Sequence, residues 1–301
     1  MGIQWAGVFT ALTSKFGEDG RLDLGSMEAH ISRQIAAGVH GIIVLGSLGE
    51  NGALSPPEKQ EVVRMAATAC SGHVPLVACV AETTTASGCE FVKKAASNGA
   101  EGFMLLPPMQ YAADERETET YLRAVAGVAD VPIMLYNNPI SYRIDITPPM
   151  FARLADERKF VAIKESSDDV RRISDIRNLV GDRYALFTGV DDLAMESLLL
   201  GASGWVAGLV CAFPRETVVL YRLVRAGRID EALSLYRWFM PLLHLDVSTK
   251  FVQNIKLAEA KADGGNERVR PPRLPLAGEE RRRVEQTIAG ALATRPNLPT
   301  V

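Results

Sequence analysis

Short runs of apolar residues alternate along this chain with longer stretches in which apolar residues recur at helical spacing. Runs of strand length, each followed by such a stretch, occur at residues 8–10, 42–45, 75–80, 102–106, 132–136, 160–163, 184–187 and 204–208. Strands that alternate with helices pair in parallel through right-handed crossovers. Eight such units over about 220 residues predict an α/β fold, namely a (β/α)8 TIM barrel.

Several predicted helices have recognisable ends. Ser55 precedes Pro56 and stands three residues before Glu58, which is the pattern of a capped helix start. Gly38 ends a first helix over residues 24–37. Further helices are expected at residues 84–97, 115–127, 148–154, 170–179, 193–200 and from 214. An open doubly wound sheet is the competing fold, but it usually has fewer strands, and no Gly-x-Gly-x-x-Gly follows the first strand.

The chain after the predicted barrel is helical in pattern. Helices are expected at residues 229–244, 251–260 and 279–293. Residues 270–275 are rich in proline and predict an extended connector. Since no linker is long enough to free this part, we expect a barrel catalytic domain at residues 1–225 and a helical domain at 226–301 packed against it.

Composition narrows the class of protein. With 47% hydrophobic and 23% charged residues, the chain of 301 residues has the balance of an ordinary globular enzyme. A formal net charge of −3 and a pI near 5.9 argue against a nucleic-acid partner, which needs a basic face. No apolar run approaches the roughly 20 residues that span a bilayer, and the N-terminus lacks the features of a signal peptide. We therefore expect a cytoplasmic protein without a membrane partner.

The spacing of cysteine and histidine gives no sign of a metal site. None of Cys70, Cys79, Cys89 and Cys211 forms a Cys-x-x-Cys pair, and the four histidines make no His-Glu-x-x-His pattern. Reduced thiols are the default in a cytoplasmic protein. A metal-dependent aldolase barrel is therefore a disfavoured alternative, and we predict neither a metal nor a cofactor.

The candidate chemistry starts from a lysine at the end of a predicted strand. Four apolar residues at 160–163 run directly into Lys164 and Glu165. An ammonium at the end of a buried strand is costly unless it is paired, neutral or used, and a desolvated lysine amine is a nucleophile toward carbonyl groups. By itself this stretch is more typical of a lysine at the rim of a sheet with its charge in water.

Other polar groups stand at the ends of neighbouring strands. Tyr136 ends the fifth strand, and Ser47 stands in a glycine-rich turn at 46–49 after the second. In a (β/α)8 barrel these ends meet at one face. There the lysine amine can form a Schiff base with a 2-oxo acid, the phenol and the hydroxyl can move protons, and backbone N–H groups of the turn can hold a carboxylate. Alone, Tyr136 and Ser47 are more typical of a strand-end aromatic and a turn residue, but the pair of lysine and tyrosine favours catalysis.

The predicted site follows from these positions. The catalytic residues are Lys164, Tyr136 and Ser47, and the substrate-binding residues are Leu48, Gly46, Gly49, Asn138, Val206 and Gly189. Glu50 is expected to support its loop or to cap the next helix. Asp191 and Asp192 are expected to start a helix, since aspartate favours the N-cap and the first turn.

Three motifs, in this order, resemble the N-acetylneuraminate lyase and dihydrodipicolinate synthase family of Schiff-base aldolases and dehydratases. The motifs are Gly-Ser-Leu-Gly-Glu at 46–50, Tyr-Asn-Asn-Pro at 136–139 and Ile-Lys-Glu-Ser at 163–166. The resemblance extends from Val8 to about Pro214. It implies a barrel with a C-terminal helical domain, Lys164 as the Schiff-base residue and Tyr136 as its proton-transfer partner. It also implies a homotetramer built as a dimer of dimers.

The chain departs from the dihydrodipicolinate synthases at positions that matter for their reaction. Ser47 and Leu48 stand where the turn of those enzymes carries two threonines. Met109 stands where a tyrosine reaches in from the neighbouring subunit, and Ser141 where an arginine holds the second substrate's carboxylate, with Arg143 out of register. The tyrosine–hydroxyl–tyrosine relay is therefore expected to be incomplete and synthase activity is disfavoured. Neuraminate lyases carry Ser-Thr in the turn, so that activity is disfavoured too.

A narrower resemblance is to the Δ1-pyrroline-4-hydroxy-2-carboxylate deaminases of hydroxyproline breakdown. It is carried by residues 46–51, 136–139, 164–167, 171–172, 190–192, 236–239 and 270–276. It implies attack of the lysine on C2 of a cyclic imine, loss of the 4-hydroxyl as water, and release of 2-oxoglutarate semialdehyde and ammonia. Ser141 agrees with a substrate that has no second carboxylate, and Leu48 suits a small uncharged ring. The implied ligand is a small 2-oxo acid or cyclic imino acid.

Two other functions are compatible with the same residues. One is a dehydratase or aldolase that acts on a 2-keto-3-deoxy sugar acid. The other is a non-catalytic sensor that binds 2-oxo acids on the same fold.

Overall fold

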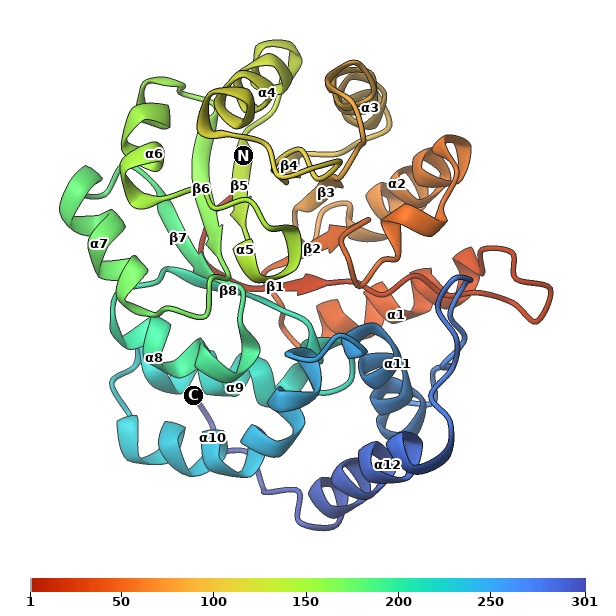
Figure 1. The fold of residues 1–301 in the computed structure, drawn as a ribbon. Helices are drawn as coiled ribbons and strands as arrows, with labels where there is room; N and C mark the ends of the chain where they lie inside the picture. The colour runs from red at the N-terminus through yellow and green to blue at the C-terminus, as the bar shows by residue number, and fades with distance from the viewer. Residues whose placement is uncertain (1) are drawn as a thin grey trace.

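The computed structural model describes residues 2–301, and in these residues eight parallel strands close into one barrel (Figure 1). The strands are β1 (Gly7–Ala11), β2 (Gly41–Val44), β3 (Leu76–Val80), β4 (Gly102–Leu105), β5 (Ile133–Asn137), β6 (Phe160–Glu165), β7 (Ala185–Thr188) and β8 (Gly204–Ala207). Each strand pairs with the next, and β8 returns to β1 with Val206 opposite Phe9. The predicted (β/α)8 TIM barrel is confirmed, and the open doubly wound sheet is excluded.

Helices follow the strands and cover the outside of the barrel. They are α1 (Leu24–Ala36), α2 (Pro56–Cys70), α3 (Thr85–Ser97), α4 (Glu115–Val128), α6 (Pro148–Arg153), α7 (Arg171–Val180), α8 (Ala194–Leu199) and α9 (Pro214–Arg225). The helix predicted over residues 193–200 is divided into a 3-10 turn, η3 (Asp191–Leu193), and α8. A four-residue helix, α5 (Pro139–Tyr142), was not predicted from the pattern.

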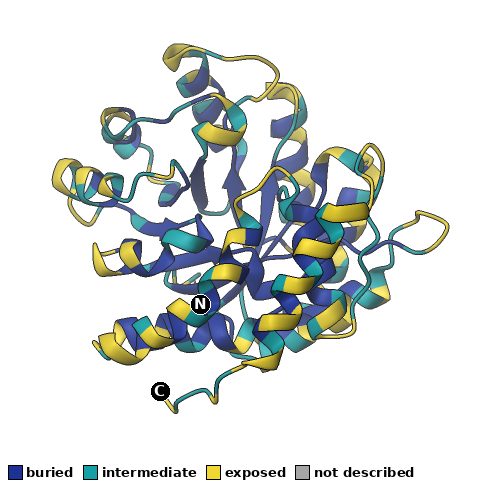
Figure 2. Ribbon diagram, turned by 60° about the horizontal axis from the view of Figure 1, so that its bottom comes forward, coloured by how far each residue is buried: buried dark blue, intermediate teal, exposed yellow. Residues whose placement is uncertain are grey.

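The interior of the barrel is a packed core. Strands of a parallel barrel are buried on both faces, because inward side chains fill the barrel and outward ones pack under the helices. Figure 2 shows buried strands at the centre and helices whose exposed residues face outward. Inside the barrel, the rings of Phe9 and Phe187 meet edge to face with centres 5.1 Å apart. A Cβ at Gly41 would lie 2.7 Å from the Phe9 ring, so only glycine leaves room for this packing.

Three C-terminal helices lie against one side of the barrel, next to α9 and α1 (Figure 1). They are α10 (Ile229–Leu243), α11 (Phe251–Ala262) and α12 (Gly278–Ala293). A buried ion pair between Lys256 and Glu50 ties α11 to the loop after β2. The helical extension is therefore confirmed, whereas its division from the barrel as a domain at 226–301, beside one at 1–225, stays a prediction.

Composition led us to expect reduced thiols and no membrane-spanning segment. Cys70, Cys79, Cys89 and Cys211 are free thiols, and burial raises the pKa of both Cys79 and Cys211 to about 12. No helix among residues 2–301 has both the length and the apolar composition needed to cross a membrane. The location in the cell stays a prediction.

Candidate active site

Lys164 lies near the carboxyl end of β6 and lines a cavity at the mouth of the barrel. Its partner in register on β5 is Tyr136, and Lys164 Nζ lies 4.0 Å from the centre of the Tyr136 ring. Lys164 is only 7% exposed. In the part of the chain that the structure describes, no carboxylate forms an ion pair with Nζ. The amine is thus buried beside the phenol, where it can meet a ligand in the cavity.

Gly189 makes the position of Lys164 possible. A Cβ added at residue 189 would lie 2.8 Å from Cγ of Lys164 and within contact distance of Ser166 Oγ. Any side chain at this point would therefore displace the lysine. Gly189 was predicted as a substrate-binding residue, and it does line the cavity, but its clearest contribution is the space that it leaves for the amine.

Ser47, Tyr142 and Tyr136 lie in a row at the mouth of the barrel. The hydroxyl of Ser47 and the phenol of Tyr142 are hydrogen-bonded at 2.5 Å. The Tyr142 ring meets the Tyr136 ring edge to face, with centres 5.6 Å apart, and Asn138 Nδ2 donates a hydrogen bond to the Tyr136 phenol at 3.2 Å. Ser47 was expected beside Tyr136, but in the structure Tyr142 contacts both of them.

Tyr142 was missed because it lies in the unpredicted helix α5. Asn138 caps this helix by accepting a hydrogen bond from Ser141 N, and Pro139 occupies its first turn, a start signal that the sequence does contain. The chain thus supplies a second phenol that the sequence pattern did not indicate, while the expectation that the tyrosine–hydroxyl–tyrosine relay is incomplete stays a prediction. Burial, followed by the neighbouring Tyr136, raises the pKa of Tyr142 well above its ordinary value, so this phenol keeps its proton at neutral pH.

The turn after β2 brings Gly46, Ser47 and Leu48 to the cavity wall. Leu45 enters the turn with a φ of 64°, a conformation that costs free energy for a residue with a side chain. A Cβ at Gly49 would lie 3.0 Å from Leu45 N, so the tight turn needs glycine there. Gly49 does not line the cavity, and its carbonyl accepts a hydrogen bond from Ser14.

The cavity has a volume of about 470 Å³, which is in the range of sites for small organic ligands. The predicted residues that line it are Gly46, Ser47, Leu48, Tyr136, Asn138, Lys164, Gly189 and Val206. Much of the remaining wall comes from the C-terminal segment, through Asp246, Val247, Ser248, Thr249, Phe251 and Arg273. Sequence reasoning missed these residues, since no local pattern shows which parts of a helical tail reach the barrel mouth.

Asp191 is a buried carboxylate behind Lys164. It accepts hydrogen bonds from Trp205 Nε1 and Leu209 N, both at 2.8 Å, and from the backbone N of Gly208 at 3.1 Å. Burial raises the pKa of Asp191 to about 6, and the hydrogen bonds oppose this rise. Asp191 does begin the turn η3, as predicted, but it also joins the ends of β7 and β8.

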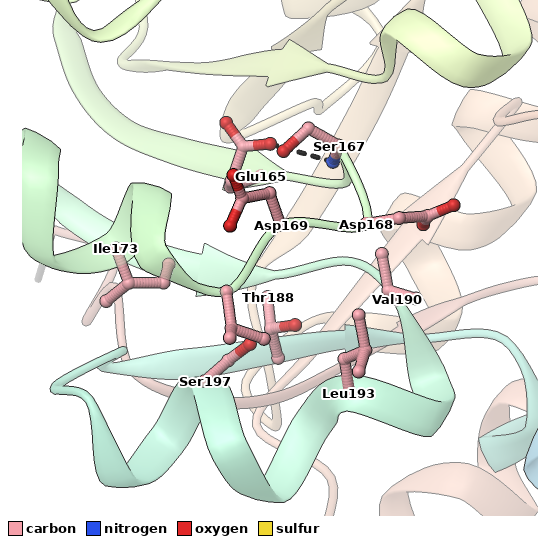
Figure 3. Close-up of a pocket in the computed structure, with 10 residues that line it drawn as sticks. Glu165, Ser167, Asp168, Asp169, Ile173, Thr188, Val190, Leu193 and Ser197 are labelled. Atoms are coloured by element: carbon pink, nitrogen blue, oxygen red, sulfur yellow. Dashed lines mark hydrogen bonds between the residues drawn. The ribbon is translucent and has the colours of Figure 1, made fainter.

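Glu165 follows Lys164 but points away from the cavity, because neighbouring residues of a strand face opposite sides. It accepts hydrogen bonds from Ser167 N at 2.8 Å and from Asn137 Nδ2 at 3.1 Å. Figure 3 shows Glu165 among the residues around a small space between β6, β7 and α7. This space of about 10 Å³ holds about one water molecule, which is too little for a substrate. The hydrogen bond from Ser167 N shows that Glu165 supports the loop after Lys164.

Glu50 supports its loop, which is one of the two roles expected for it. It pairs with the buried Lys256 and accepts a hydrogen bond from Arg270 N at 3.0 Å. The next helix, α2, is capped by Ser55, whose N and Oγ both donate to Glu58. Glu50 therefore fastens the catalytic turn to the C-terminal segment.

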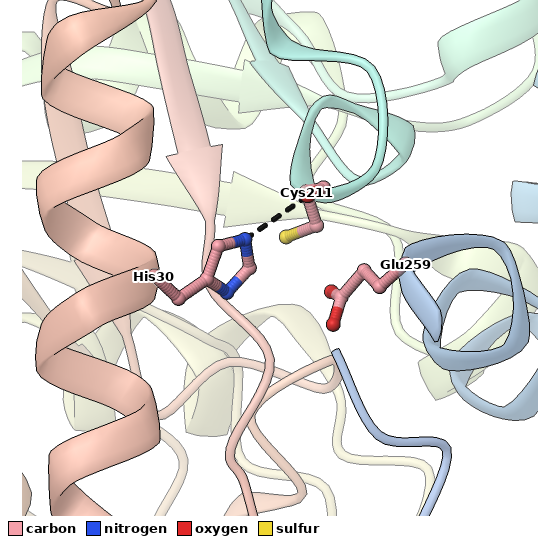
Figure 4. Close-up of side chains that lie close together, drawn as sticks. All are labelled: His30, Cys211 and Glu259. Carbon is pink, nitrogen blue, oxygen red and sulfur yellow. Dashed lines mark hydrogen bonds between the residues drawn. The ribbon is translucent and has the colours of Figure 1, made fainter. Parts of the chain in front are cut away.

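A second cluster of polar side chains lies where α1, the 3-10 turn at Leu209–Cys211 and α11 meet. His30, Cys211 and Glu259 bring potential metal-ligand atoms within 4.8 Å of one another (Figure 4). Glu259 is already bound by the ammonium of Lys15 and by the Thr13 hydroxyl, the latter at 2.7 Å. Lys15 thus supplies the positive charge at Glu259, and burial lowers the pKa of His30 well below its ordinary value. The expectation of no metal site stays a prediction.

Comparison with known proteins identifies the family. The model of the dihydrodipicolinate synthetase family matches residues 4–291. The chain belongs to this family. Over 238 residues, covering 79% of this chain and 80% of the relative, it is 34% identical to a 4-hydroxy-tetrahydrodipicolinate synthase from Methanothrix thermoacetophila.

Solved structures of the dihydrodipicolinate synthetase family agree with this fold over nearly all of the chain. The 4-hydroxy-tetrahydrodipicolinate synthase of Methylacidiphilum fumariolicum SolV has a TM-score of 0.91 and 28% identity, covering 96% of this chain and 97% of its own. YagE of E. coli K12, solved in complex with pyruvate, has a TM-score of 0.90 and 26% identity, covering 95% of this chain and 98% of its own. The family consists of class I lyases, which act through a lysine Schiff base, and this protein is an enzyme of that type.

Proposed function

We propose that this enzyme converts Δ1-pyrroline-4-hydroxy-2-carboxylate to 2-oxoglutarate semialdehyde and ammonia through a Schiff base on Lys164. The observation that carries the proposal is the place of Lys164 Nζ, which is buried in the cavity, lies 4.0 Å from the centre of the Tyr136 ring and has no ion-pair partner among residues 2–301. A lysine amine in such a place can attack the imine carbon of the substrate.

The proposed reaction begins with attack of Lys164 on C2 of the ring. The ring nitrogen is displaced, and the substrate is then held as an open-chain Schiff base. Loss of a proton from C3 gives an enamine, which expels the 4-hydroxyl group as water. The unsaturated amine that remains isomerises and is hydrolysed to the aldehyde, with release of ammonia. A second water hydrolyses the Schiff base, which frees Lys164 and releases 2-oxoglutarate semialdehyde. Overall, one water is lost and two are taken up.

Tyr136, Tyr142 and Ser47 are proposed to move the protons during Schiff-base formation and breakdown. Ser47 and Tyr142 are hydrogen-bonded, and the Tyr136 ring contacts both the Tyr142 ring and the amine of Lys164. Proton transfer by positioned side chains contributes typically about 10²–10⁴-fold to a rate. All three belong to one chain, so the proposed relay needs no tyrosine from a neighbouring subunit. The homotetramer expected from the family stays a prediction.

The position of Ser141 supports a substrate with one carboxylate. Ser141 lines the cavity where the synthases are expected to place an arginine. Leu48, which is buried and also lines the cavity, adds an apolar wall that suits a small ring. Both features favour the cyclic imine over the substrates of dihydrodipicolinate synthase.

A second candidate substrate is a 2-keto-3-deoxy sugar acid. The cavity of about 470 Å³ is larger than a five-membered ring requires, and Ser248, Thr249 and Arg273 add polar groups to its wall. The nearest carboxylate to Arg273 is Glu50 at 3.9 Å, and Glu50 is already paired. These donors favour a longer chain of hydroxyl groups, on which the same lysine would act.

The test is turnover by the purified protein. We expect ammonia release from the cyclic imine, borohydride-dependent covalent labelling with pyruvate, and loss of both in Lys164→Ala. Turnover of a sugar acid without ammonia release from the imine would favour the second candidate. Binding of 2-oxo acids without turnover of either substrate would favour the sensor and contradict the proposal.

A further inference from the structure

Asp246 brings a carboxyl group from the C-terminal segment into the cavity that Lys164 lines. It ends η5 (His244–Asp246), the 3-10 turn between α10 and α11. The carboxyl lies against the backbone just after β8, because a Cβ at Gly208 would be 2.7 Å from Asp246 Cγ. Only glycine leaves this space, so the carboxyl is seated at the barrel mouth rather than on the outer surface.

The hydrogen bonding of Asp246 differs from that of its neighbour Asp191. Oδ1 of Asp246 is buried and has no hydrogen-bond partner among the described residues, whereas Asp191 accepts bonds from Trp205 and two backbone N–H groups. A buried polar atom without a partner is rare and requires an explanation. Oδ1 is closed off against Gly208, so a substrate bound in the cavity that Asp246 lines would meet the carboxyl through Oδ2.

The surroundings of Asp246 and Asp191 affect the pKa of the two carboxyl groups differently. The groups that face it are Lys164, Asp191, Asp192 and the thiol of Cys211. Burial, followed by Asp191, raises the pKa of Asp246 well above its ordinary value, and Lys164 opposes the rise. The bonds that Asp191 accepts favour its charged form. When their environments push the pKa values of two neighbouring carboxyl groups apart, the group with the higher pKa can serve as the acid.

We propose that Asp246 is the acid that protonates the hydroxyl group leaving from the substrate. The proposal rests on the proposed function, in which Lys164 holds the substrate as an enamine. The electron pair of the C2–C3 double bond forms the C3–C4 double bond as the C4–O bond breaks. The oxygen leaves as water with the carboxyl proton of Asp246, and the Lys164 adduct becomes a conjugated iminium. The carboxylate regains its proton when a second water hydrolyses the Lys164 iminium, because that hydrolysis frees the amine and releases one proton.

The experiment compares Asp246→Asn with wild type on two leaving groups. Ammonia release from the 4-hydroxy imine is expected to fall by about 10²–10⁴-fold, because the amide cannot supply the proton. With the 4-fluoro analogue, the loss is expected to be less than about tenfold, since fluoride leaves without protonation. Borohydride trapping of pyruvate and exchange of its methyl protons with solvent deuterium are expected to be unchanged, because neither needs a leaving group.

Asp192→Asn is the matched control, since Asp192 carries a nearby charge but does not line the cavity. It is expected to retain wild-type turnover of both compounds. Equal losses for hydroxide and fluoride in Asp246→Asn, or loss of pyruvate trapping, would overturn the proposal in favour of a role in positioning Lys164. If wild type traps pyruvate but releases no ammonia, the proposed substrate is wrong. The same comparison then applies to a 2-keto-3-deoxy sugar acid and its 4-fluoro analogue, and equal losses there overturn the role of Asp246.

Discussion

At the scale of single residues, two glycines control where the functional side chains of the cavity lie. Gly189 leaves the space that Lys164 occupies, and Gly208 leaves the space for the carboxyl of Asp246. Neither glycine has a left-handed φ that would explain it, so the close approach of a neighbouring side chain is the physical reason for each. A motif that marks only charged and aromatic residues overlooks such positions.

Tyr142→Phe tests the relay at this scale. Removing the phenol breaks the hydrogen bond to Ser47, and turnover is expected to fall by about 10²-fold because proton transfer is interrupted. The aromatic packing on Tyr136 remains, so the thermal unfolding temperature is expected to change little. Steady-state ammonia release gives the measurement, with Tyr111→Phe as the control because Tyr111 is 58% exposed. Wild-type turnover in Tyr142→Phe would show that the relay does not need this residue.

At the scale of elements, the C-terminal connector is clamped to the start of α2. Arg270 holds Glu58 through two hydrogen bonds, at 2.9 and 3.0 Å, and its backbone N bonds Glu50. The guanidinium of Arg270 also lies over the Phe16 ring, 4.5 Å from its centre. A planar guanidinium suits this combination of paired carboxylate and aromatic face. The clamp fixes the segment from which Arg273 reaches the cavity.

Glu58→Gln tests this clamp through its dependence on pH. The hydrogen bonds from Arg270 lower the pKa of Glu58 to about 2 in the folded protein, against an ordinary value of 4.5. The folded state therefore binds fewer protons than the unfolded state, so the stabilisation is complete above pH 4.5 and is lost as the pH falls toward 2. Urea unfolding is expected to show Glu58→Gln less stable than wild type at pH 7, with the difference shrinking between pH 4.5 and 3.

The control for this prediction is Glu90→Gln, which removes an exposed ion pair with Lys94. Exposed ion pairs contribute about 0–1 kcal/mol to the free energy of unfolding. This variant is therefore expected to unfold nearly as wild type does at pH 7 and at pH 3. An equal destabilisation of Glu58→Gln at pH 7 and pH 3 would contradict the assigned role of the carboxylate charge.

At the scale of the whole molecule, the barrel and the C-terminal helices share one core and one cavity. Phe213, after β8, packs edge to face on Phe239 of α10 with ring centres 5.9 Å apart. Two buried ion pairs cross the same boundary, Lys256 with Glu50 and Glu259 with Lys15. A buried charge that loses its partner costs about 3–5 kcal/mol, so each part stabilises the other.

A fragment of residues 1–225 tests whether the barrel is an independent domain. Without α10–α12, Glu50 and Lys15 lose their partners and Phe213 loses its apolar cover, so we expect no cooperative thermal unfolding and no near-ultraviolet circular dichroism of a packed core. A fragment of residues 1–296 retains all three helices and is expected to unfold as the full chain does. Cooperative unfolding of the shorter fragment would show instead that the barrel folds alone.

The barrel, its eight units and the approach of Lys164 to Tyr136 could all be predicted from the order of residues. These follow from local periodicity and from the rule that parallel strands of a barrel end at one face. Folding of the whole chain is needed to bring Tyr142 into contact with Ser47 and Tyr136, and to bring Asp246 and Arg273 to the cavity. Asp246 stands 82 residues from Lys164 in the chain, and such neighbours are set by the packing of helices on the barrel, which no local pattern of residues records.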